Sequence, residues 1–513
     1  MSMKAAMVRR MIGGKDMPCP FECHDTALFG RETCARREER LSFLMARHIE
    51  IFDTTLRDGN KLPFAVLSPS DRLLLARQLA RLGADVIEAG FPADSSEEAE
   101  CVARISGEVR GPFVAALARA RESDVEKALK SLRSAEKPYL HLFMSVSPQF
   151  IEHVLKEKEA DALRSLSQCI RIARAAKVRV QFSLSEAPHA RREFLREVCA
   201  AARDAGAEVI NLADTNGILL PEGMAGLVTE VRDVLGAAKP GSPLIGVHCH
   251  NDLGLATANT LAAIRAGASH VEVTVGGFGE RAGNAALEEI AFLLTAFGKR
   301  EGLTHGIRLG EIGRTARLFE SLTGIHAHPN KPIIGQTAFV PAAGGFSGHS
   351  LDPDLRQLLQ EKTIGNGPDA APLEGQSAEA PGPYVLESFN VLTSSHSPPV
   401  GVVVIRRDGK TLTQTSHGNG PIDALFSAVD KALGFSTRMV LYSVSTLATG
   451  TEALTEVIVT VELRGRRFHG RYTSTDVIEA SLRAYMRACN AIGESGILEG
   501  PGDYHISGEY LWE

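Results

Sequence analysis

The sequence predicts an α/β protein in which a TIM (β/α)8 barrel is followed by a smaller α+β unit. Between residues 48 and 325, short β-rich runs alternate with helical stretches, and about 275 residues is a usual length for such a barrel. Polar residues gather at the carboxyl ends of these runs, where TIM barrels hold their active sites. A second unit with an internal repeat follows. We therefore divide the chain into a leader (1–47), a barrel (48–325), a linker region (326–383) and a C-terminal unit (384–513).

The β-rich runs are the expected barrel strands. Each is short and bounded by turn residues, and a helix-sized connection follows it. The runs are Ile49–Leu56, Val86–Pro92, Phe113–Arg119, Tyr139–Val146, Arg179–Ser185, Val209–Thr215, Leu244–His250 and His270–Gly276. The first connecting helix is the clearest, because Ser68 can cap its start and Gly83 can end it.

The C-terminal part shows a linker and then a repeat. Residues 366–383 are dense in Pro, Gly, Ala and Glu, which is typical of a flexible linker, and residues 326–365 are expected to hold short helical pieces. Residues 420–428 echo residues 474–484, and each segment begins a helix after a β-like run. We expect two β-rich repeats, each closed by a helix. The unit contains no His/Cys/Asp cluster and no phosphate loop, so its sequence favours binding or regulation over catalysis.

Composition excludes several classes of partner. The net charge of −6 gives no basic excess for nucleic acid. No run approaches the ~18 apolar residues of a membrane span, and the N-terminus lacks the apolar core of a secretory signal. The cysteines are scattered as reduced thiols usually are, which predicts a cytoplasmic protein. The spacing of Cys19, Cys23, His24 and Cys34 matches no standard zinc site.

A metal site is indicated by two histidines. His248 and His250 are two residues apart, so on a strand their side chains leave the same face. Neutral imidazole nitrogens suit a divalent transition metal. Asp53, after a strand-like run, and Asn284, in a glycine-rich turn, could add oxygen ligands. These residues would form a mixed nitrogen/oxygen site with room for a substrate.

The motifs together resemble those of a known family. The segment Asp53-Thr-Thr-Leu-Arg-Asp-Gly59 and the segment 248–289, with its His-Cys-His and Gly-Glu-Arg-Ala-Gly-Asn motifs, resemble the signature pair of the DRE-TIM metallolyases. The C-terminal repeats resemble the regulatory and dimerisation domain of the 2-isopropylmalate synthases. The resemblance covers residues 48–495, nearly the whole chain. It implies an acyltransferase that condenses acetyl-CoA with a 2-oxo acid, most readily 2-oxoisovalerate, to give a 2-alkylmalate such as 2-isopropylmalate. It also implies a homodimer with an amino-acid effector, leucine.

The resemblance further implies residue roles. The metal would be Mn, Mg, Zn or Co, with Mn or Mg favoured, and its ligands would be Asp53, His248, His250 and Asn284. The catalytic residues would be Arg57, which neutralises charge developing on oxygen, Glu280, which orients ligands or assists proton transfer, and Glu186. The substrate would be bound by Arg57, Thr215 and His141, with Thr215 on the carboxylate of the oxo acid.

Several positions depart from the family pattern. The usual Gly-Glu-Gln is Gly59-Asn60-Lys61, and an expected Glu is Ser185, with Glu186 where the family has Asp. Three expected histidines are replaced by Phe150, Pro341 and Phe346, and His349 is a candidate to substitute for the last of them. The substitutions at 150, 185 and 346 predict an apolar oxo acid at least as large as 2-oxoisovalerate. They also leave alternatives open: a citramalate, homocitrate or bulkier 2-alkylmalate synthase, or a non-catalytic effector-binding paralogue.

Overall fold

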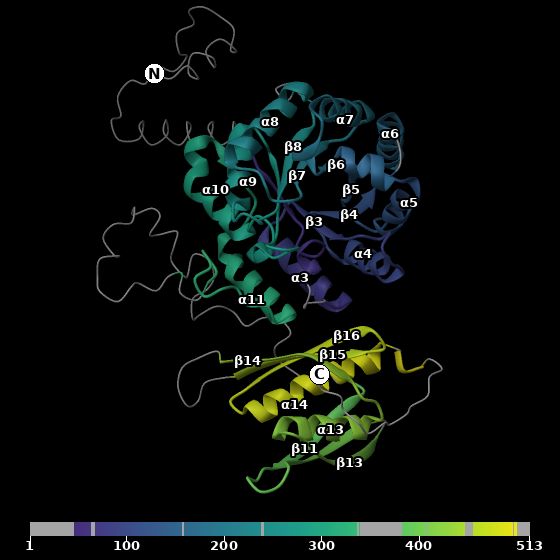
Figure 1. Ribbon diagram of the computed structural model, residues 1–513, viewed down its shortest axis with the longest axis vertical. Coiled ribbons are helices and arrows are strands. Elements are labelled where there is room, and N and C mark those ends of the chain that lie inside the picture. Colours follow the sequence, from purple (N-terminus) through teal and green to yellow (C-terminus); the bar gives the residue numbers. More distant parts are fainter. Residues whose placement is uncertain are drawn as a thin grey trace, which may run out of the picture.

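A closed barrel of parallel strands forms the first half of the protein (Figure 1). The computed structural model describes residues 46–62, 67–155, 158–236, 241–335, 338, 382–407, 409–446, 455–495 and 497–499. The barrel strands follow one another in chain order: β2 (Glu50–Asp53), β3 (Val86–Gly90), β4 (Phe113–Arg119), β5 (Pro138–Ser145), β6 (Arg179–Ser185), β7 (Val209–Asp214), β8 (Leu244–Cys249) and β9 (His270–Val273). The eight expected strands are confirmed. The first and last are shorter than their apolar runs, because residues 54–56 form a turn after β2 and residues 275–277 form a short helical turn after β9.

Helices surround the barrel (Figure 1). They are α3 (Pro69–Leu82), α4 (Ser96–Glu108), α5 (Glu122–Ser131), α6 (Glu159–Ala175), α7 (Arg192–Ala205), α8 (Pro221–Leu235), α9 (Ala256–Ala266) and α10 (Leu287–Glu301), with α11 (Ile312–Thr323) after them. The predicted start and end of α3 are confirmed: Ser68 and Asp71 form a capping box, and Gly83 ends the helix with φ +95°. Short helical turns occur at η1 (Gly59–Lys61), η2 (Phe150–Leu155), η3 (Ala187–His189), η4 (Val275–Gly277) and η5 (Leu309–Glu311). Strand β1 (Arg47–His48) pairs in parallel with β10 (Leu303–Thr304) outside the barrel.

The interior of the barrel is polar beneath its mouth. Glu88 of β3 contacts His141 of β5 with 2.6 Å between Oε1 and Nδ1. Asn211 of β7 donates to Glu272 of β9 at 2.9 Å. In both cases the two strands are not neighbours in the barrel, so these side chains meet across its interior. All four residues are buried, and buried polar groups need partners of this kind. This network lies inside the barrel, next to the residues at its mouth.

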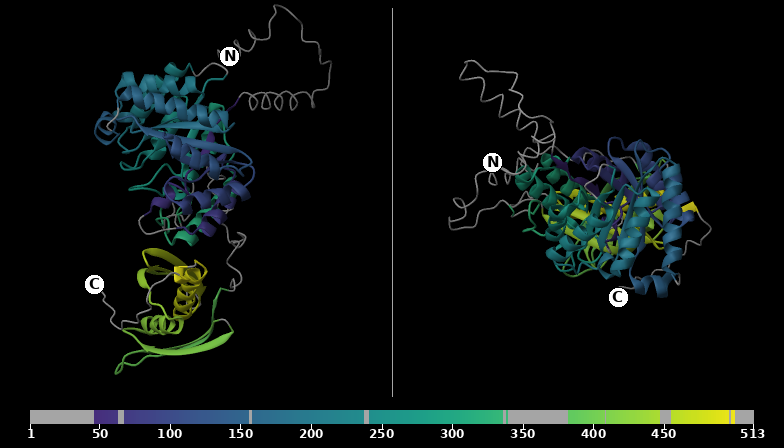
Figure 2. Two further views of the ribbon diagram at one scale, coloured as in Figure 1. Left: turned by 90° about the vertical axis from the view of Figure 1, so that its right-hand side faces the viewer. Right: turned by 90° about the horizontal axis from the view of Figure 1, so that it is seen from above.

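The C-terminal unit consists of two similar halves (Figures 1 and 2). Each half is a three-stranded antiparallel sheet followed by a helix, as the repeat predicts. The first contains β11 (Tyr384–Leu392), β12 (Val400–Arg407), β13 (Lys410–His417) and α13 (Pro421–Leu433). The second contains β14 (Arg438–Thr446), β15 (Thr455–Leu463), β16 (Arg466–Ser474) and α14 (Val477–Glu494), with the turn η6 (Ile497–Glu499) at its end. The two helices pack together: the rings of Phe426 and Tyr485 stack with centroids 4.2 Å apart.

Several expectations lie outside the described residues. These are the N-terminal cysteine cluster, most of the linker region, and positions 341, 346 and 349. Among the residues that the structure describes, five cysteines are buried and unpaired, at positions 101, 169, 199, 249 and 489. No described helix has both the length and the apolar character that crossing a membrane requires.

Candidate metal centre and active site

The two histidines lie side by side at the mouth of the barrel. His248 is close to the end of β8 and His250 follows it, so the strand alternation directs both rings to one side. Their ring centroids are 4.9 Å apart, and both side chains are buried. Burial and the neighbouring His248 lower the pKa of His250 to about 3. His250 is therefore neutral at physiological pH, the form in which an imidazole binds a metal.

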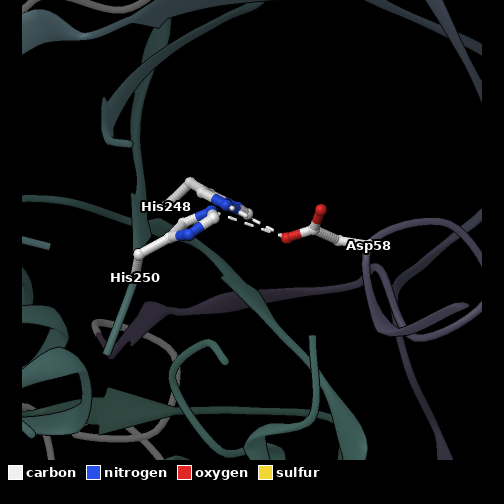
Figure 3. Close-up of side chains that lie close together, drawn as sticks. All are labelled: Asp58, His248 and His250. Carbon is white, nitrogen blue, oxygen red and sulfur yellow. Dashed lines mark ion pairs between the residues drawn. The ribbon is translucent and has the colours of Figure 1, made fainter. Parts of the chain in front are cut away.

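The carboxylate that faces these histidines belongs to Asp58 (Figure 3). Its Oδ2 atom is 3.6 Å from Nε2 of His248 and 3.6 Å from Nε2 of His250. Asp58 comes from the loop after β2, where its backbone N–H donates to the carbonyl of Thr54. The structure thus differs from the expectation for Asp53, whose carboxylate accepts hydrogen bonds from Thr55 N and Oγ1 at 2.9 and 3.0 Å. Asp58 takes the place of Asp53 in the candidate ligand set.

The donor atoms fit a divalent cation. Among the described residues, Oδ2 of Asp58 and Oδ1 of Asn284 are buried oxygens without a hydrogen-bond partner. Asn284 forms an isolated backbone bridge with His250, which brings it to the same corner of the barrel. A buried oxygen without a partner is costly, and a bound cation would remove that cost. Two imidazole nitrogens with carboxylate and amide oxygens form a mixed donor set that suits a divalent cation.

Arg57 lies directly beside this carboxylate. Its Nη1 donates to Oδ1 of Asp58 at 2.9 Å, and its Nε donates to Oε2 of Glu88 at 2.7 Å. Burial alone would raise the pKa of Asp58, but the Arg57 guanidinium holds it well below its usual range. The carboxylate therefore stays ionised, with one oxygen on Arg57 and the other directed toward the histidines. Glu88 fixes the guanidinium from the opposite side.

Glu272 of β9 orients His248 by a hydrogen bond inside the barrel. Its Oε2 accepts a hydrogen bond from Nδ1 of His248 at 2.7 Å, which leaves Nε2 free to face Asp58. Burial would raise the pKa of Glu272, but His141 and His248 lower it to about 2. An ionised carboxylate behind a histidine fixes the tautomer and ring orientation that a metal requires. Burial would by itself lower the pKa of His248, yet contact with Glu272 raises it.

Comparisons with known proteins identify the family of the chain. Residues 48–319 match the HMGL-like family, and residues 352–493 match the LeuA allosteric (dimerisation) domain. A 2-isopropylmalate synthase of Pyrococcus furiosus is 38% identical to the chain over 501 residues, which is 87% of this chain and 100% of the relative. The chain belongs to the 2-isopropylmalate synthase family. A 2-isopropylmalate synthase of Heliobacterium modesticaldum is 34% identical over 88% of this chain and 98% of the relative. A solved hydroxymethylglutaryl-CoA lyase from Pseudomonas aeruginosa is 20% identical, with a TM-score of 0.48, and covers 55% of this chain and 95% of that chain.

In this member of the 2-isopropylmalate synthase family, Thr215 and Glu186 lie together at the ends of β7 and β6. The Oγ1 atom of Thr215 accepts from the backbone N–H of Glu186 at 2.9 Å and is 3.2 Å from Oγ of Ser185. Glu186 has a left-handed backbone with φ 57°, and its carboxylate accepts from Oγ of Ser147 at 2.7 Å and also from Oγ of Ser145. The departure at this position therefore places a carboxylate among serine hydroxyls, with a threonine hydroxyl beside it.

Glu280 lies at the rim, where its carboxylate is close to two cations. Its Oε2 is 2.9 Å from Nζ of Lys61, and its Oε1 is 3.3 Å from Nη1 of Arg281. The hydrogen bond from Lys61 lowers the pKa of Glu280. Arg281 also holds Asp252 and is 2.8 Å from Nδ1 of His250. Through these contacts, Glu280 balances the positive charges of Lys61 and Arg281.

His141 of β5 lies between Glu88 and Ser183 inside the barrel. Its Nδ1 is 2.6 Å from Glu88 and its Nε2 is 2.6 Å from Oγ of Ser183. The ring is buried and both nitrogens contact protein groups.

Three supporting or ligating carboxylates were missed in the reading of the sequence. Asp58 was available in the first motif, directly after Arg57, but it lies beyond the strand end on which the expectation relied. Glu88 is one of several polar residues near the carboxyl ends of the β-rich runs, and its sequence context does not distinguish it from the others. Glu272 shares the inward face of β9 with His270, and this two-residue spacing is the signal that could have found it.

The support from Glu272 gives a testable prediction. Glu272 accepts from His248, Gln181 and Asn211. A Glu272→Gln variant retains the shape but has only one acceptor oxygen, and its amide would face donors. We expect the affinity for Mn²⁺ to fall about 10- to 100-fold, as is usual for such partners of metal ligands. Titration of Mn²⁺ into chelator-treated protein measures the change.

The matched control is Glu208→Gln. Glu208 is an exposed glutamate that pairs with Arg174 and precedes β7, at the opposite end of the barrel. This variant should bind Mn²⁺ as the unmodified protein does. Equal affinities for the Glu272→Gln variant and the unmodified protein would show that Glu272 does not support the cation site.

Proposed function

We propose that this protein catalyses a metal-dependent condensation of acetyl-CoA with 2-oxoisovalerate, giving 2-isopropylmalate and CoA. The observation that carries the proposal is the group of Asp58, His248 and His250, with Arg57 beside it, at the mouth of the barrel. Its support is the 38% identity to a 2-isopropylmalate synthase along that relative's full length. The cation is Mn or Mg by preference, with Zn or Co as alternatives, and Asn284 is the fourth ligand. The place of action is the cytoplasm.

The reaction forms one carbon–carbon bond and breaks one thioester bond. A base removes a proton from the acetyl methyl group, the resulting carbon attacks the ketone carbon of the oxo acid, and the ketone oxygen takes up a proton to become the hydroxyl of the product. Water then cleaves the thioester and releases CoA. When bound, the cation acts as a Lewis acid on the oxo acid. Arg57 stabilises the charge that develops on oxygen, because its planar guanidinium is already fixed between Asp58 and Glu88.

Two further residues take parts in this proposal. The half-buried hydroxyl of Thr215 binds the carboxylate of the oxo acid, and Ser185 lies next to it at 3.2 Å. Glu186 is the candidate base, since it is a carboxylate beside Thr215 that the hydroxyls of Ser145 and Ser147 hold in place by donating to it. Glu280, held by Lys61, keeps the rim neutral rather than removing the proton.

Substrate preference rests on the departures from the family pattern. Phe150 and Ser185 are apolar or small where relatives carry ionisable groups, so they offer no charge to a second carboxylate. Lys61 is a new cation, and it lies at the site, but its ammonium is already bound by Asp58 and Glu280. An apolar oxo acid therefore fits better than 2-oxoglutarate. A misfit of one methylene in such a pocket is worth about 10- to 200-fold in kcat/KM.

The test compares kcat/KM for pyruvate, 2-oxoisovalerate, phenylpyruvate and 2-oxoglutarate in a CoA-release assay. We expect 2-oxoisovalerate or a larger apolar acid to be preferred. A clear preference for pyruvate or 2-oxoglutarate would instead support a citramalate or homocitrate synthase. Absence of condensation with every acid would support a non-catalytic effector-binding paralogue.

Regulation is the proposed role of the C-terminal unit. Residues 352–493 match the LeuA allosteric (dimerisation) domain. The unit repeats one arrangement twice, a three-stranded sheet followed by a helix. We infer a homodimer that binds leucine. A chain ending at Pro383 should lose feedback by leucine and the dimer, while it still binds Mn²⁺. Light scattering and inhibition curves measure both, and undiminished inhibition of the truncated chain would contradict the regulatory role.

A further inference from the structure

Lys61 brings a second cation to the carboxylate that faces the histidines. Its Nζ is 3.0 Å from Oδ1 of Asp58 and 2.9 Å from Oε2 of Glu280. Lys61 and Glu280 are 219 residues apart in sequence and come from the loops after β2 and after β9. The ion pair therefore joins two loops at the edge of the candidate metal centre. Both side chains are nearly half exposed, at 46% and 44%.

The local backbone explains why Lys61 reaches Asp58. Residues 59–61 form the turn η1, in which the backbone N–H of Lys61 donates to the carbonyl of Asp58 at 3.1 Å. Side chains three residues apart are eclipsed in a 3₁₀ turn, so position 61 is placed over position 58. A lysine here necessarily brings its charge to this carboxylate.

The position of Asp58 does not depend on Lys61. Nη1 of Arg57 already donates to the same oxygen, Oδ1, at 2.9 Å, and the Arg57 side chain is only 12% exposed. Asp58 itself is buried, and its Oδ2 points to the histidines. Because Arg57 orients the carboxylate, the contribution of Lys61 to the site is mainly its positive charge.

We propose that the positive charge of Lys61, at the rim of the barrel, weakens the binding of a divalent cation at Asp58, His248 and His250. Its ammonium repels the incoming cation directly. It also partly neutralises two carboxylates, since it forms ion pairs with both Glu280 and Asp58. The protein would therefore exchange its cation more readily than the same barrel with a neutral residue at position 61. The inference rests on the proposed function only in that a cation binds here.

A charge series at position 61 tests this proposal. Mn²⁺ is titrated into chelator-treated full-length protein. The Kd is obtained from the concentration of free Mn²⁺, measured by electron paramagnetic resonance. Lys61→Gln should lower the Kd about 3- to 10-fold at low ionic strength, and the gain should shrink in high salt. Lys61→Arg keeps the charge and should stay within about twofold of the unmodified protein. Glu280→Gln should raise the Kd, and the double variant Lys61→Gln/Glu280→Gln should return close to the unmodified value.

The matched control is Lys137→Gln. Lys137 is also an exposed lysine, but it precedes β5 at the opposite end of the barrel and donates to the carbonyl of Gly111. It should leave the Kd unchanged. The proposal is overturned if Lys61→Gln binds Mn²⁺ no more tightly than the unmodified protein, or if Lys137→Gln or Lys61→Arg shifts the Kd as far as Lys61→Gln does. Absence of Mn²⁺ binding by the unmodified protein would overturn the metal centre itself, an outcome that is distinct from a failure at Lys61.

Discussion

Replacing Asp58 by asparagine should remove divalent-cation binding and reduce kcat/KM by about 10³ or more, the several kcal/mol that a bound metal supplies. The Oδ2 atom of Asp58 lies 3.6 Å from both histidine Nε2 atoms and has no hydrogen-bond partner among the described residues. A neutral amide loses the charge that balances the ion. His248→Ala and His250→Ala should have the same effect. The barrel should stay folded, because these side chains lie at its mouth rather than among its apolar contacts.

The matched control is Asp53→Asn, a change of the same size five residues earlier. Asp53 is fully buried, and burial raises its pKa to about 7. Its carboxylate is occupied by Thr55, so the affinity for Mn²⁺ should remain near that of the unmodified protein. Loss of Mn²⁺ binding in Asp53→Asn, with retention in Asp58→Asn, would restore Asp53 as the ligand.

The second large effect is expected at Arg57. An Arg57→Lys variant keeps the charge but cannot donate simultaneously to Glu88 and Asp58 with the planar geometry of a guanidinium. If Arg57 stabilises charge that develops in the transition state, kcat should fall about 10²- to 10³-fold, as when one oxyanion donor is lost. Steady-state kinetics with saturating acetyl-CoA measure this change.

Arg179→Lys is the control for Arg57→Lys. Arg179 is a similarly shielded arginine that donates from both Nη atoms to Glu50, but it lies at the start of β6, away from the mouth. Its replacement should lower the melting temperature and leave kcat unchanged. A change confined to KM in Arg57→Lys would assign Arg57 to substrate binding alone.

The fold could be predicted because its signals are local. Short apolar runs alternating with helical segments gave all eight barrel strands, and Ser68 and Gly83 marked the ends of α3. The C-terminal repeat was visible as two similar helix starts after β-like runs. The outer strands of its sheets were less visible, because β13 reads Lys-Thr-Leu-Thr-Gln-Thr-Ser-His and is largely exposed.

The site could be predicted only in part, because its contacts are between distant residues. The two-residue spacing brought His248 and His250 together, as the structure has them. The choice between Asp53 and Asp58 depended on how the chain turns after β2, where the backbone of Asp58 bonds to Thr54. Such a turn leaves no periodic pattern. Glu272 and Glu88 act through contacts with residues 24 and 53 positions away, which a strand pattern alone does not reveal.

The central claim is that a divalent cation at Asp58, His248 and His250 carries the condensation. The most direct measurement is CoA release from acetyl-CoA and 2-oxoisovalerate by protein that has been stripped with a chelator, before and after Mn²⁺ or Mg²⁺ is returned. We expect no release by the stripped protein, recovery with the metal, and no recovery in Asp58→Asn. Undiminished release by the stripped protein, or full recovery in Asp58→Asn, would contradict it.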